Sequence, residues 1–227
     1  MTAPDAQGDS TDMLYEHIFF DLDGTLSDPS EGIANGIMYA QKKWGLPCGP
    51  RSDYYKFIGP PMPQSFCDFL GFSQEDAVRF LACFREYYSV TGIFENRLFD
   101  GMATLLHTLK AQGAKLYVAT TKPQLFADRL MEHFGIADCF ACVSGCGLDG
   151  LRNSKREVIE YARDTCGVDM TKAVLIGDRL FDVEGARECG IPCIGVEYGF
   201  GGREELEAAG AVHTVATVEE LGEYLLG

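Results

Sequence analysis

Two carboxylates, Asp21 and Asp23, stand two residues apart at the end of an apolar run, in the segment FFDLDGTLSD (residues 19–28). A short apolar run of this kind is typical of a buried strand. Gly24 and Thr25 follow at once, which indicates a tight turn. A buried strand that ends in two acids is suited to meet water, a metal ion or a substrate.

Further side chains capable of chemistry lie at the ends of other predicted elements. Thr120 ends the apolar segment KLYVAT and is followed by Thr121, while Asp178 and Asp182 come after KAVLIG. Lys155 opens the helix expected after FACVSG. Because ligands bind outside the carboxyl ends of strands in open parallel sheets, we expect these side chains to converge at one sheet edge.

Most of these residues also have a purely structural interpretation. Asp and Thr after strands often cap helices or form turns, and we assign Asp28 mainly to capping. Asp182 would be favourable at a helix N-terminus in any case. Lys155 differs, because a cation in the first turn of a helix opposes the helix dipole. An anion bound nearby would explain its position.

The chemistry of the set is coherent. Clustered carboxylates repel one another unless a cation neutralises them, and oxygen ligands with open water positions suit Mg²⁺. A carboxylate can attack phosphorus and form an aspartyl-phosphate, which divides hydrolysis into two easier steps. A metal, a lysine and main-chain N–H groups would stabilise the phosphoryl oxygens. A second carboxyl could protonate the leaving oxygen and then activate water.

The elements that must position these residues alternate between strand and helix. Predicted strands cover residues 17–21, 115–120, 140–145, 172–177, 191–196 and 211–215. Predicted helices lie near 101–112, 123–134, 154–166, 180–189, 203–209 and 217–226. This alternation indicates an α/β fold with a doubly wound, parallel-sheet, Rossmann-like core.

Residues 29–94 interrupt the alternation and are expected to form a small α-helical cap inserted after the first strand. One helix is predicted to begin with Asp28 as N-cap and Pro29 at its first position, and a second to begin at Ser73. Prolines 60, 61 and 63 break the region between them. We therefore divide the chain into a disordered tail (1–12), a core (13–28 and 95–227) and a cap (29–94).

Composition narrows the possible partners and location. The 227 residues carry a formal charge of -15, which disfavours nucleic acid and anionic membranes as partners. The acidic N-terminus does not resemble a signal peptide, and no apolar stretch approaches the ~20 residues of a membrane span, so a cytoplasmic protein is expected. The nine cysteines are expected to be mostly reduced core residues, and the lone C-x-x-C at 139–142 disfavours zinc.

Four segments together resemble a known family. DLDGT, ATTKP, the lysine of RNSKREVI and IGDRLFD resemble, in this order, the four motifs of the haloacid dehalogenase superfamily. The resemblance extends over almost all of the chain after residue 16. It points to the capped branch that contains phosphoglycolate phosphatases and 5'-nucleotidase-like phosphatases.

The resemblance implies specific roles. Asp21 would be the nucleophile and Asp23 the general acid and base, while Thr120 and Lys155 would bind the phosphoryl group. Thr121, where relatives often have Asn, is included among the substrate-binding residues. The implied Mg²⁺ ligands are Asp21, the Asp23 carbonyl, Asp178 and, in support, Asp182. The cap would close over the site on hinges near 27–29 and 95–100.

The expected activity is a Mg²⁺-dependent hydrolysis of a small phosphorylated metabolite, with phosphoglycolate, nucleotides and sugar phosphates as candidate substrates. A phosphosugar mutase on the same scaffold is one alternative. A receiver-type phosphoacceptor domain is another, although receivers are about half as long and lack the helical insertion, and a catalytically silent binding protein is a third. Selectivity is expected from the cap, where Asn35, Lys56 and Arg97 are candidates.

Overall fold

The core of the molecule is a parallel sheet. The computed structural model describes residues 14–147 and 151–227, so the predicted tail at residues 1–12 lies outside the described residues. Within that part of the chain, six strands pair in the order β5-β4-β1-β6-β7-β8, and each pairing is parallel. The strands are β1 (His17–Phe20), β4 (Lys115–Pro123), β5 (Phe140–Cys146), β6 (Ala173–Gly177), β7 (Cys193–Val196) and β8 (His213–Val215). The predicted doubly wound α/β fold is confirmed.

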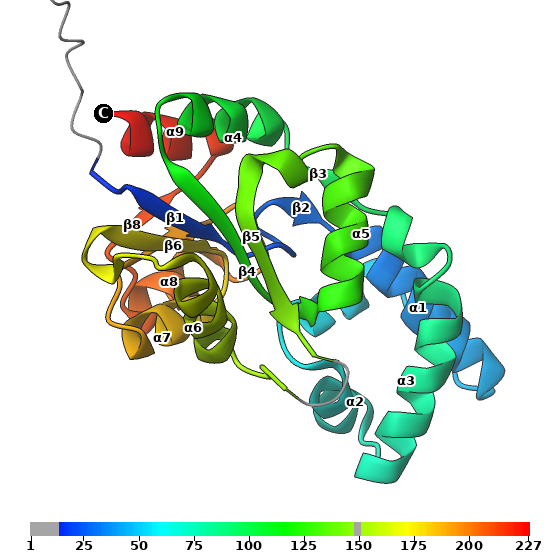
Figure 1. Cartoon of the computed structure of the whole chain (residues 1–227). Helices are drawn as coiled ribbons and strands as arrows, with labels where there is room; N and C mark the ends of the chain where they lie inside the picture. The colour runs from blue at the N-terminus through cyan, green and yellow to red at the C-terminus, as the bar shows by residue number, and fades with distance from the viewer. Residues whose placement is uncertain (1–13, 148–150) are drawn as a thin grey trace, which may run out of the picture.

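Helices cover both faces of this sheet (Figure 1). Successive side chains of a strand point to opposite faces, so Ile18 and Phe20 pack in one hydrophobic cluster while Phe19 packs in the other. The first cluster includes residues of α4 (Met102–Ala111), α5 (Gln124–Phe134) and α9 (Val218–Leu226). The second includes residues of α6 (Lys155–Cys166), α7 (Leu180–Glu188) and α8 (Gly202–Ala209).

The strand order creates a crevice at the carboxyl end of β1. Strand β1 lies between β4 and β6, so the chain segments that follow these neighbours leave the sheet on either side of Asp21. All four residues of β1 are buried, which holds the strand end rigidly. Open parallel sheets bind ligands at such a switch point, and the predicted site residues follow these strands.

Three helices form the insertion between β1 and β4: α1 (Ser30–Lys43), α2 (Met62–Leu70) and α3 (Gln74–Tyr88). Short 3-10 helices lie at Arg51–Phe57 and Gly92–Phe94. As predicted, Ser73 caps α3, and its hydroxyl accepts a hydrogen bond from the Asp76 N–H. The insertion packs into the same hydrophobic cluster as one face of the sheet, through residues such as Ile37 and Phe66.

Two local expectations in the insertion were wrong. The N-cap of α1 is Pro29 rather than Asp28, although the Asp28 carboxylate still accepts a hydrogen bond from the Ser30 N–H. Pro63 lies in the first turn of α2 rather than in an irregular break. Proline is tolerated there because the first N–H groups of a helix have no partner within it.

The chain leaves and re-enters the core through a short antiparallel pair, β2 (Ser27–Asp28) and β3 (Arg97–Leu98). These strands lie within the two segments predicted to act as hinges. The Arg97 guanidinium pairs with the Asp28 carboxylate across them. The division of the chain into a separate core and cap, and the hinge motion itself, stay predictions.

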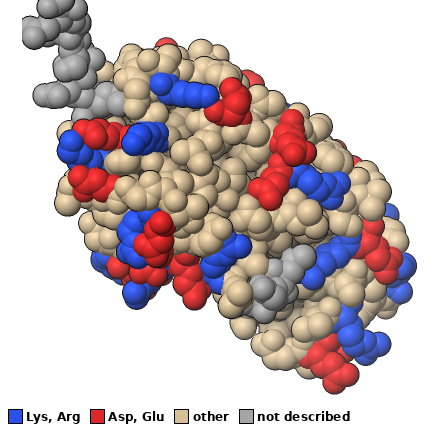
Figure 2. All heavy atoms as spheres, viewed as in Figure 1, with Lys and Arg blue, Asp and Glu red and all other residues tan. Residues whose placement is uncertain are grey.

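The surface and the cysteines bear on the other sequence expectations. On the face shown in Figure 2, basic side chains are interspersed with acidic ones rather than gathered in one patch. No described helix is long and apolar enough to cross a membrane. All nine cysteines are free thiols. Cys139 and Cys193 are buried, and Cys67, Cys83, Cys142, Cys166 and Cys189 are partly buried and pack against the two hydrophobic clusters. Most of the cysteines therefore pack in or against the core, as expected.

Candidate active site

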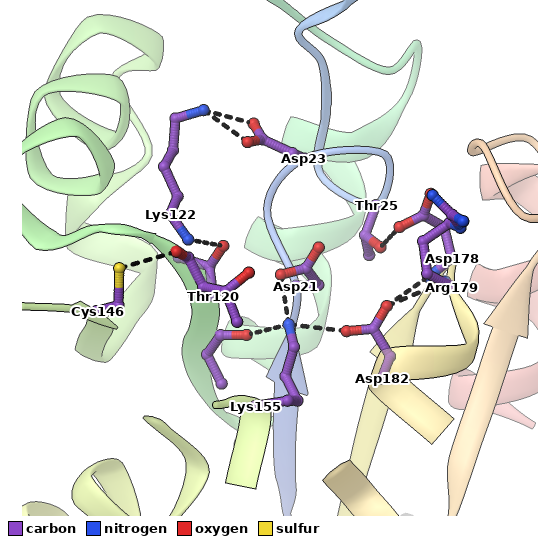
Figure 3. Close-up of polar contacts among 12 residues, drawn as sticks. Asp21, Asp23, Thr25, Thr120, Lys122, Cys146, Lys155, Asp178, Arg179 and Asp182 are labelled. Atoms are coloured by element: carbon purple, nitrogen blue, oxygen red, sulfur yellow. Dashed lines mark hydrogen bonds and ion pairs between the residues drawn. The ribbon is translucent and has the colours of Figure 1, made fainter. Parts of the chain in front are cut away.

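A buried lysine joins two carboxylates at the carboxyl end of β1 (Figure 3). The Lys155 ammonium lies 2.5 Å from Asp21 Oδ1 and 2.7 Å from Asp182 Oδ1. It also donates to the Ala119 carbonyl at 2.8 Å. Three predicted site residues from distant parts of the chain are therefore brought together.

The start of α6 explains how Lys155 reaches this position. Ser154 and Glu157 form a capping box at the N-terminus of the helix, which fixes its first turn. The Lys155 side chain points inward and is only 6% exposed. Burial alone would lower the pKa of Lys155, but Asp182 and Asp21 outweigh it and hold the pKa above its usual value. The lysine is therefore a permanent cation among the acids.

Asp182 has a structural role at the start of α7 as well. Its Oδ2 accepts hydrogen bonds from the N–H groups of Asp178 and Arg179, at 3.1 and 3.0 Å. Because its Oδ1 contacts Lys155, both carboxylate oxygens are engaged. Asp182 thus orients the lysine and caps the helix. Its predicted part in metal binding stays a prediction.

Asp21, Asp178 and Asp182 form the acidic group that could hold a cation, with one oxygen from each lying within 4.8 Å of the others. Asp178 forms no ion pair within the described chain, although its Oδ2 accepts from the Phe200 N–H at 2.8 Å. Burial, followed by the neighbouring Asp182 and Asp21 carboxylates, raises the pKa of Asp178 well above its usual range. Three buried acids with one lysine leave a deficit of positive charge, and these oxygen ligands fit Mg²⁺.

Gly24 allows the loop after β1 to approach this cluster. Its φ of +91° lies in the left-handed region, and a Cβ at this position would lie 2.2 Å from Asp178 Oδ2. Any side chain would therefore displace the carboxylate. The sequence indicated the tight turn at Gly24, and the structure adds that the glycine makes room for Asp178.

Asp23 is held by a residue whose importance the sequence analysis missed. The Lys122 ammonium contacts both oxygens of the Asp23 carboxylate, at 2.8 and 2.6 Å, and both side chains are largely buried. Burial raises the pKa of Asp23, and Lys122 opposes that shift. The Asp23 side chain faces Lys122 and does not belong to the acidic cluster. Its predicted metal contact therefore concerns the main-chain carbonyl and stays a prediction.

One feature of the sequence, the spacing from Thr120, could have identified Lys122 as a site residue. Residues two apart in a strand share a face, and Lys122 follows Thr120 by two positions in β4. The Thr120 hydroxyl is buried and accepts a hydrogen bond from the Lys122 N–H at 3.2 Å. Thr121 is half-buried, and its carbonyl accepts from the Cys146 thiol at 2.9 Å.

A cavity of about 460 Å³ lies between the insertion and the ends of these strands. Asp23, Thr120, Thr121 and Lys122 line it from the core. The opposite side, which we call the roof, is mostly apolar and consists of Ile33, Phe57, Met62, Leu81, Phe84, Arg85 and Tyr88. We call the buried residues at the strand ends the floor. They are Asp21, Thr120, Lys155, Asp178 and Asp182, and of these Thr120 lines the cavity.

The three specificity candidates suggested by the sequence do not line this cavity. Asn35 donates to the Glu95 carboxylate at 2.9 Å, and Arg97 pairs with Asp28. The Lys56 ammonium lies over the Phe57 and Phe69 rings. Sequence alone did not show which side chains of the helices face the core.

Arg179 links the insertion to the core. Its Nη1 donates to the Ile58 carbonyl of the insertion at 2.6 Å, and its Nε pairs with Glu205 of α8 at 2.8 Å. Arg179 directly follows Asp178, so the link starts beside the acidic cluster. The insertion is thus connected to the floor by a charged hydrogen bond as well as by apolar packing.

Relatives of known name are similar in sequence to this chain over most of their length. A 5'-nucleotidase from Pseudomonas aeruginosa is 41% identical over 94% of this chain and 96% of its own. Tyrosine-protein kinase PtkA from Mycobacterium tuberculosis is 36% identical over 92% of this chain and 72% of its own. A phosphoglycolate phosphatase from Cupriavidus necator matches at 30% identity over 90% of both chains.

Solved structures and the family assignment agree with the fold. The crystal structure of a predicted phosphatase from Clostridium acetobutylicum superposes with a TM-score of 0.89, at 41% identity over 93% of this chain and 98% of that one. Residues 18–196 match the haloacid dehalogenase-like hydrolase family, a span that contains every residue of the floor. The resemblance seen in the four motifs is confirmed, and the chain belongs to the haloacid dehalogenase-like hydrolases as an enzyme of the phosphatase type.

Proposed function

We propose that this phosphatase hydrolyses a phosphomonoester with Mg²⁺ through an aspartyl-phosphate on Asp21. The observation that carries the proposal is the buried contact of Lys155 with Asp21, beside two further acids that leave room for a cation. A carboxylate oriented by a fixed ammonium is a suitable nucleophile. Asp21, Asp178 and the Asp23 carbonyl would hold Mg²⁺, which would neutralise charge on the phosphoryl oxygens.

Residues of this chain would carry out both steps of the reaction, which are formation and hydrolysis of the aspartyl-phosphate. A carboxylate oxygen of Asp21 attacks phosphorus, the ester P–O bond breaks, and Asp23 gives its proton to the leaving oxygen. Water then attacks phosphorus, Asp23 takes a proton from it, and the bond between Asp21 and phosphorus breaks to release inorganic phosphate. Lys155 and Thr120 would contact the phosphoryl oxygens during both displacements.

The cavity favours a substrate larger than phosphoglycolate. A volume of about 460 Å³ with Phe57, Phe84 and Phe126 in its walls suits an alcohol that presents a wide apolar or aromatic face. A nucleoside has such a face, whereas glycolate does not. The similarity to a 5'-nucleotidase supports the same choice, so we propose nucleoside monophosphates as the substrate class.

A cytoplasmic location is part of the proposal. Nine free thiols are stable in a reducing compartment, where disulfides are rare. A small phosphorylated metabolite would be available there. We propose no nucleic acid or membrane partner, in keeping with the net charge of -15.

A substrate panel tests the proposal. Purified protein with Mg²⁺ is assayed against p-nitrophenyl phosphate, nucleoside monophosphates, phosphoglycolate and sugar phosphates, and the intermediate is sought by borohydride reduction followed by peptide mass spectrometry. We expect the highest kcat/KM with a nucleoside monophosphate and label on Asp21. Activity that survived both D21N and chelation of divalent metal would contradict the mechanism. Phosphoryl transfer from ATP to a tyrosine peptide, assayed in parallel, distinguishes the chemistry named for PtkA.

A further inference from the structure

Tyr88, the last residue of α3, has a buried hydroxyl whose proton has no acceptor within the described part of the chain. The neighbouring Lys122 ammonium interacts with this hydroxyl, but an ammonium can only donate. The residue is 4% exposed and lines the cavity from the roof. Buried polar atoms almost always have a partner, because an unpaired hydroxyl costs free energy in an apolar environment. A hydroxyl proton without an acceptor in a cavity wall indicates an acceptor that arrives with a ligand.

The surroundings of Tyr88 place the hydroxyl beside the proposed acid and base. Its ring stacks on Phe84 with centroids 4.9 Å apart and meets Phe126 edge-on at 5.6 Å. The Lys122 ammonium lies 5.3 Å from the centroid of the same ring while it pairs with Asp23. Burial raises the pKa of Tyr88, so the group remains an O–H donor.

We propose that the Tyr88 hydroxyl is a specificity-determining group that hydrogen-bonds a polar group on the leaving alcohol of the substrate, close to the ester oxygen. The inference rests on the proposed function, in which Asp23 protonates that oxygen. Lys155 contacts Asp21 at the floor, whereas Lys122 links Tyr88 to Asp23. Tyr88 therefore lies on the side of the leaving alcohol rather than on that of the phosphoryl group.

The proposal defines a substrate class. The apolar roof accepts the bulk of the alcohol, and one hydroxyl of the alcohol replaces the missing partner of Tyr88. A site that hydrogen-bonds a substrate hydroxyl rejects the analogue that lacks it, because the protein group is then left unpaired. Alcohols that carry a hydroxyl near the ester carbon fit this requirement, among them the ribose of a nucleotide and polyols such as glycerol.

Two phosphate esters that share one carbon skeleton can test the role of Tyr88. Glycerol 2-phosphate carries hydroxyls beside the ester carbon, and isopropyl phosphate is the same skeleton without them. We expect the wild-type protein to prefer glycerol 2-phosphate by about tenfold in kcat/KM, the value of one good hydrogen bond. In Y88F the ratio of the two kcat/KM values should fall to about one, because kcat/KM for glycerol 2-phosphate decreases. These esters are not nucleotides, so the result does not depend on the nucleotide assignment.

Tyr87→Phe is the matched control. Tyr87 is the preceding residue, lies outside the cavity, and donates to the Glu95 carboxylate at 2.8 Å. Y87F should keep the preference and lower Tm, because it loses a hydrogen bond. Y88F should lower Tm less than Y87F, because the Tyr88 hydroxyl donates to no acceptor among the described residues of the free protein.

Three results would overturn the role of Tyr88: equal or undetectable wild-type rates on the two esters, an unchanged preference in Y88F, or loss of the preference in Y87F as well. The D21N variant keeps these failures apart from a failure of the proposed function. Hydrolysis of p-nitrophenyl phosphate that depends on Asp21, combined with any of the three, rejects only the role of Tyr88. Hydrolysis independent of Asp21 rejects the mechanism on which both rest.

Discussion

The buried floor at the strand ends and the roof of the cavity differ in composition. The floor is buried and charged. Lys155 forms ion pairs with two of its three carboxylates, those of Asp21 and Asp182. The roof is apolar and aromatic, with Arg85 as its cation and Tyr88 as its hydroxyl. In the proposed function, the floor would act on the phosphoryl group, which every phosphate ester has in common. The roof would contact the alcohol, which differs from one ester to the next.

In the proposed function, catalysis depends on the floor and the choice of substrate depends on the roof. A buried network of charges tolerates few changes, because each group left unpaired costs free energy. An apolar wall tolerates substitutions that preserve volume, so its shape can change without loss of the charged network. Substitutions in the floor should therefore reduce the rate on every ester, and substitutions in the roof should change the ranking of esters.

The largest expected effect is that of Asp21→Asn. Removal of the proposed nucleophile should lower kcat by at least about 10³-fold on every ester, since covalent catalysis is lost. Steady-state kinetics on p-nitrophenyl phosphate and AMP measure it, with Asp164→Asn on the surface as control. A loss confined to one ester would contradict the assignment of the floor to the chemistry.

Lys155→Met comes next. It leaves Asp21 and Asp182 without their shared cation, so kcat should fall about 10²-fold and the free energy of unfolding by about 3 kcal/mol. Urea unfolding and kinetics are measured on the same preparation. The exposed neighbour Arg156, which pairs with Glu160, is the control, and R156M should change stability by less than about 1 kcal/mol. Equal effects of the two variants would refute the special role of Lys155.

Phe84→Ala tests the roof. Phe84 packs against Tyr88 and Phe66 and is 4% exposed, so truncation should lower the free energy of unfolding by about 3 kcal/mol. It should also lower kcat/KM for AMP by about tenfold, with a smaller loss on a compact ester. Val78→Ala, at an exposed position of the same helix, is the control. Identical losses on large and compact esters would remove the distinction between roof and floor.

The smallest expected effect is at the link between the two regions. Arg179→Met removes the hydrogen bond to the Ile58 carbonyl together with the ion pair to Glu205, and should lower the free energy of unfolding by about 1–2 kcal/mol. It should lower kcat/KM by about fivefold on all esters alike, or ~1 kcal/mol. Arg179→Lys should retain part of this contact, so an R179K variant no better than R179M would contradict the role of the link.

Much of the fold could be predicted because its signals are local. The apolar runs of β1 and β6 are buried strands wherever they pack, and Ser73 caps its helix through residues three positions away. The two wrong expectations in the insertion also concerned local features of the sequence. Pro63 was interpreted as a break, but the first turn of a helix accommodates proline as well as a loop does.

The residues that sequence reasoning missed depend on contacts across long separations. Lys122 meets Asp23 across 99 positions, and Arg179 meets Ile58 across 121. Tyr88 resembles any aromatic residue on the buried stripe of a helix, and its missing partner is visible only once its neighbours are in place. Periodicity assigns a face to a helix, but it does not show what that face meets.

The amino-acid sequence was sufficient to identify the family, because the four motifs that contain Asp21, Lys155 and Asp178 occur in order along the chain. Tertiary structure alone decided which groups stand against one another. The pairing of Lys122 with Asp23, the room that Gly24 leaves for Asp178 and the volume under the roof all arise from packing between distant segments. Substrate selectivity depends on that packing, since side chains recognise an alcohol by where they converge in space.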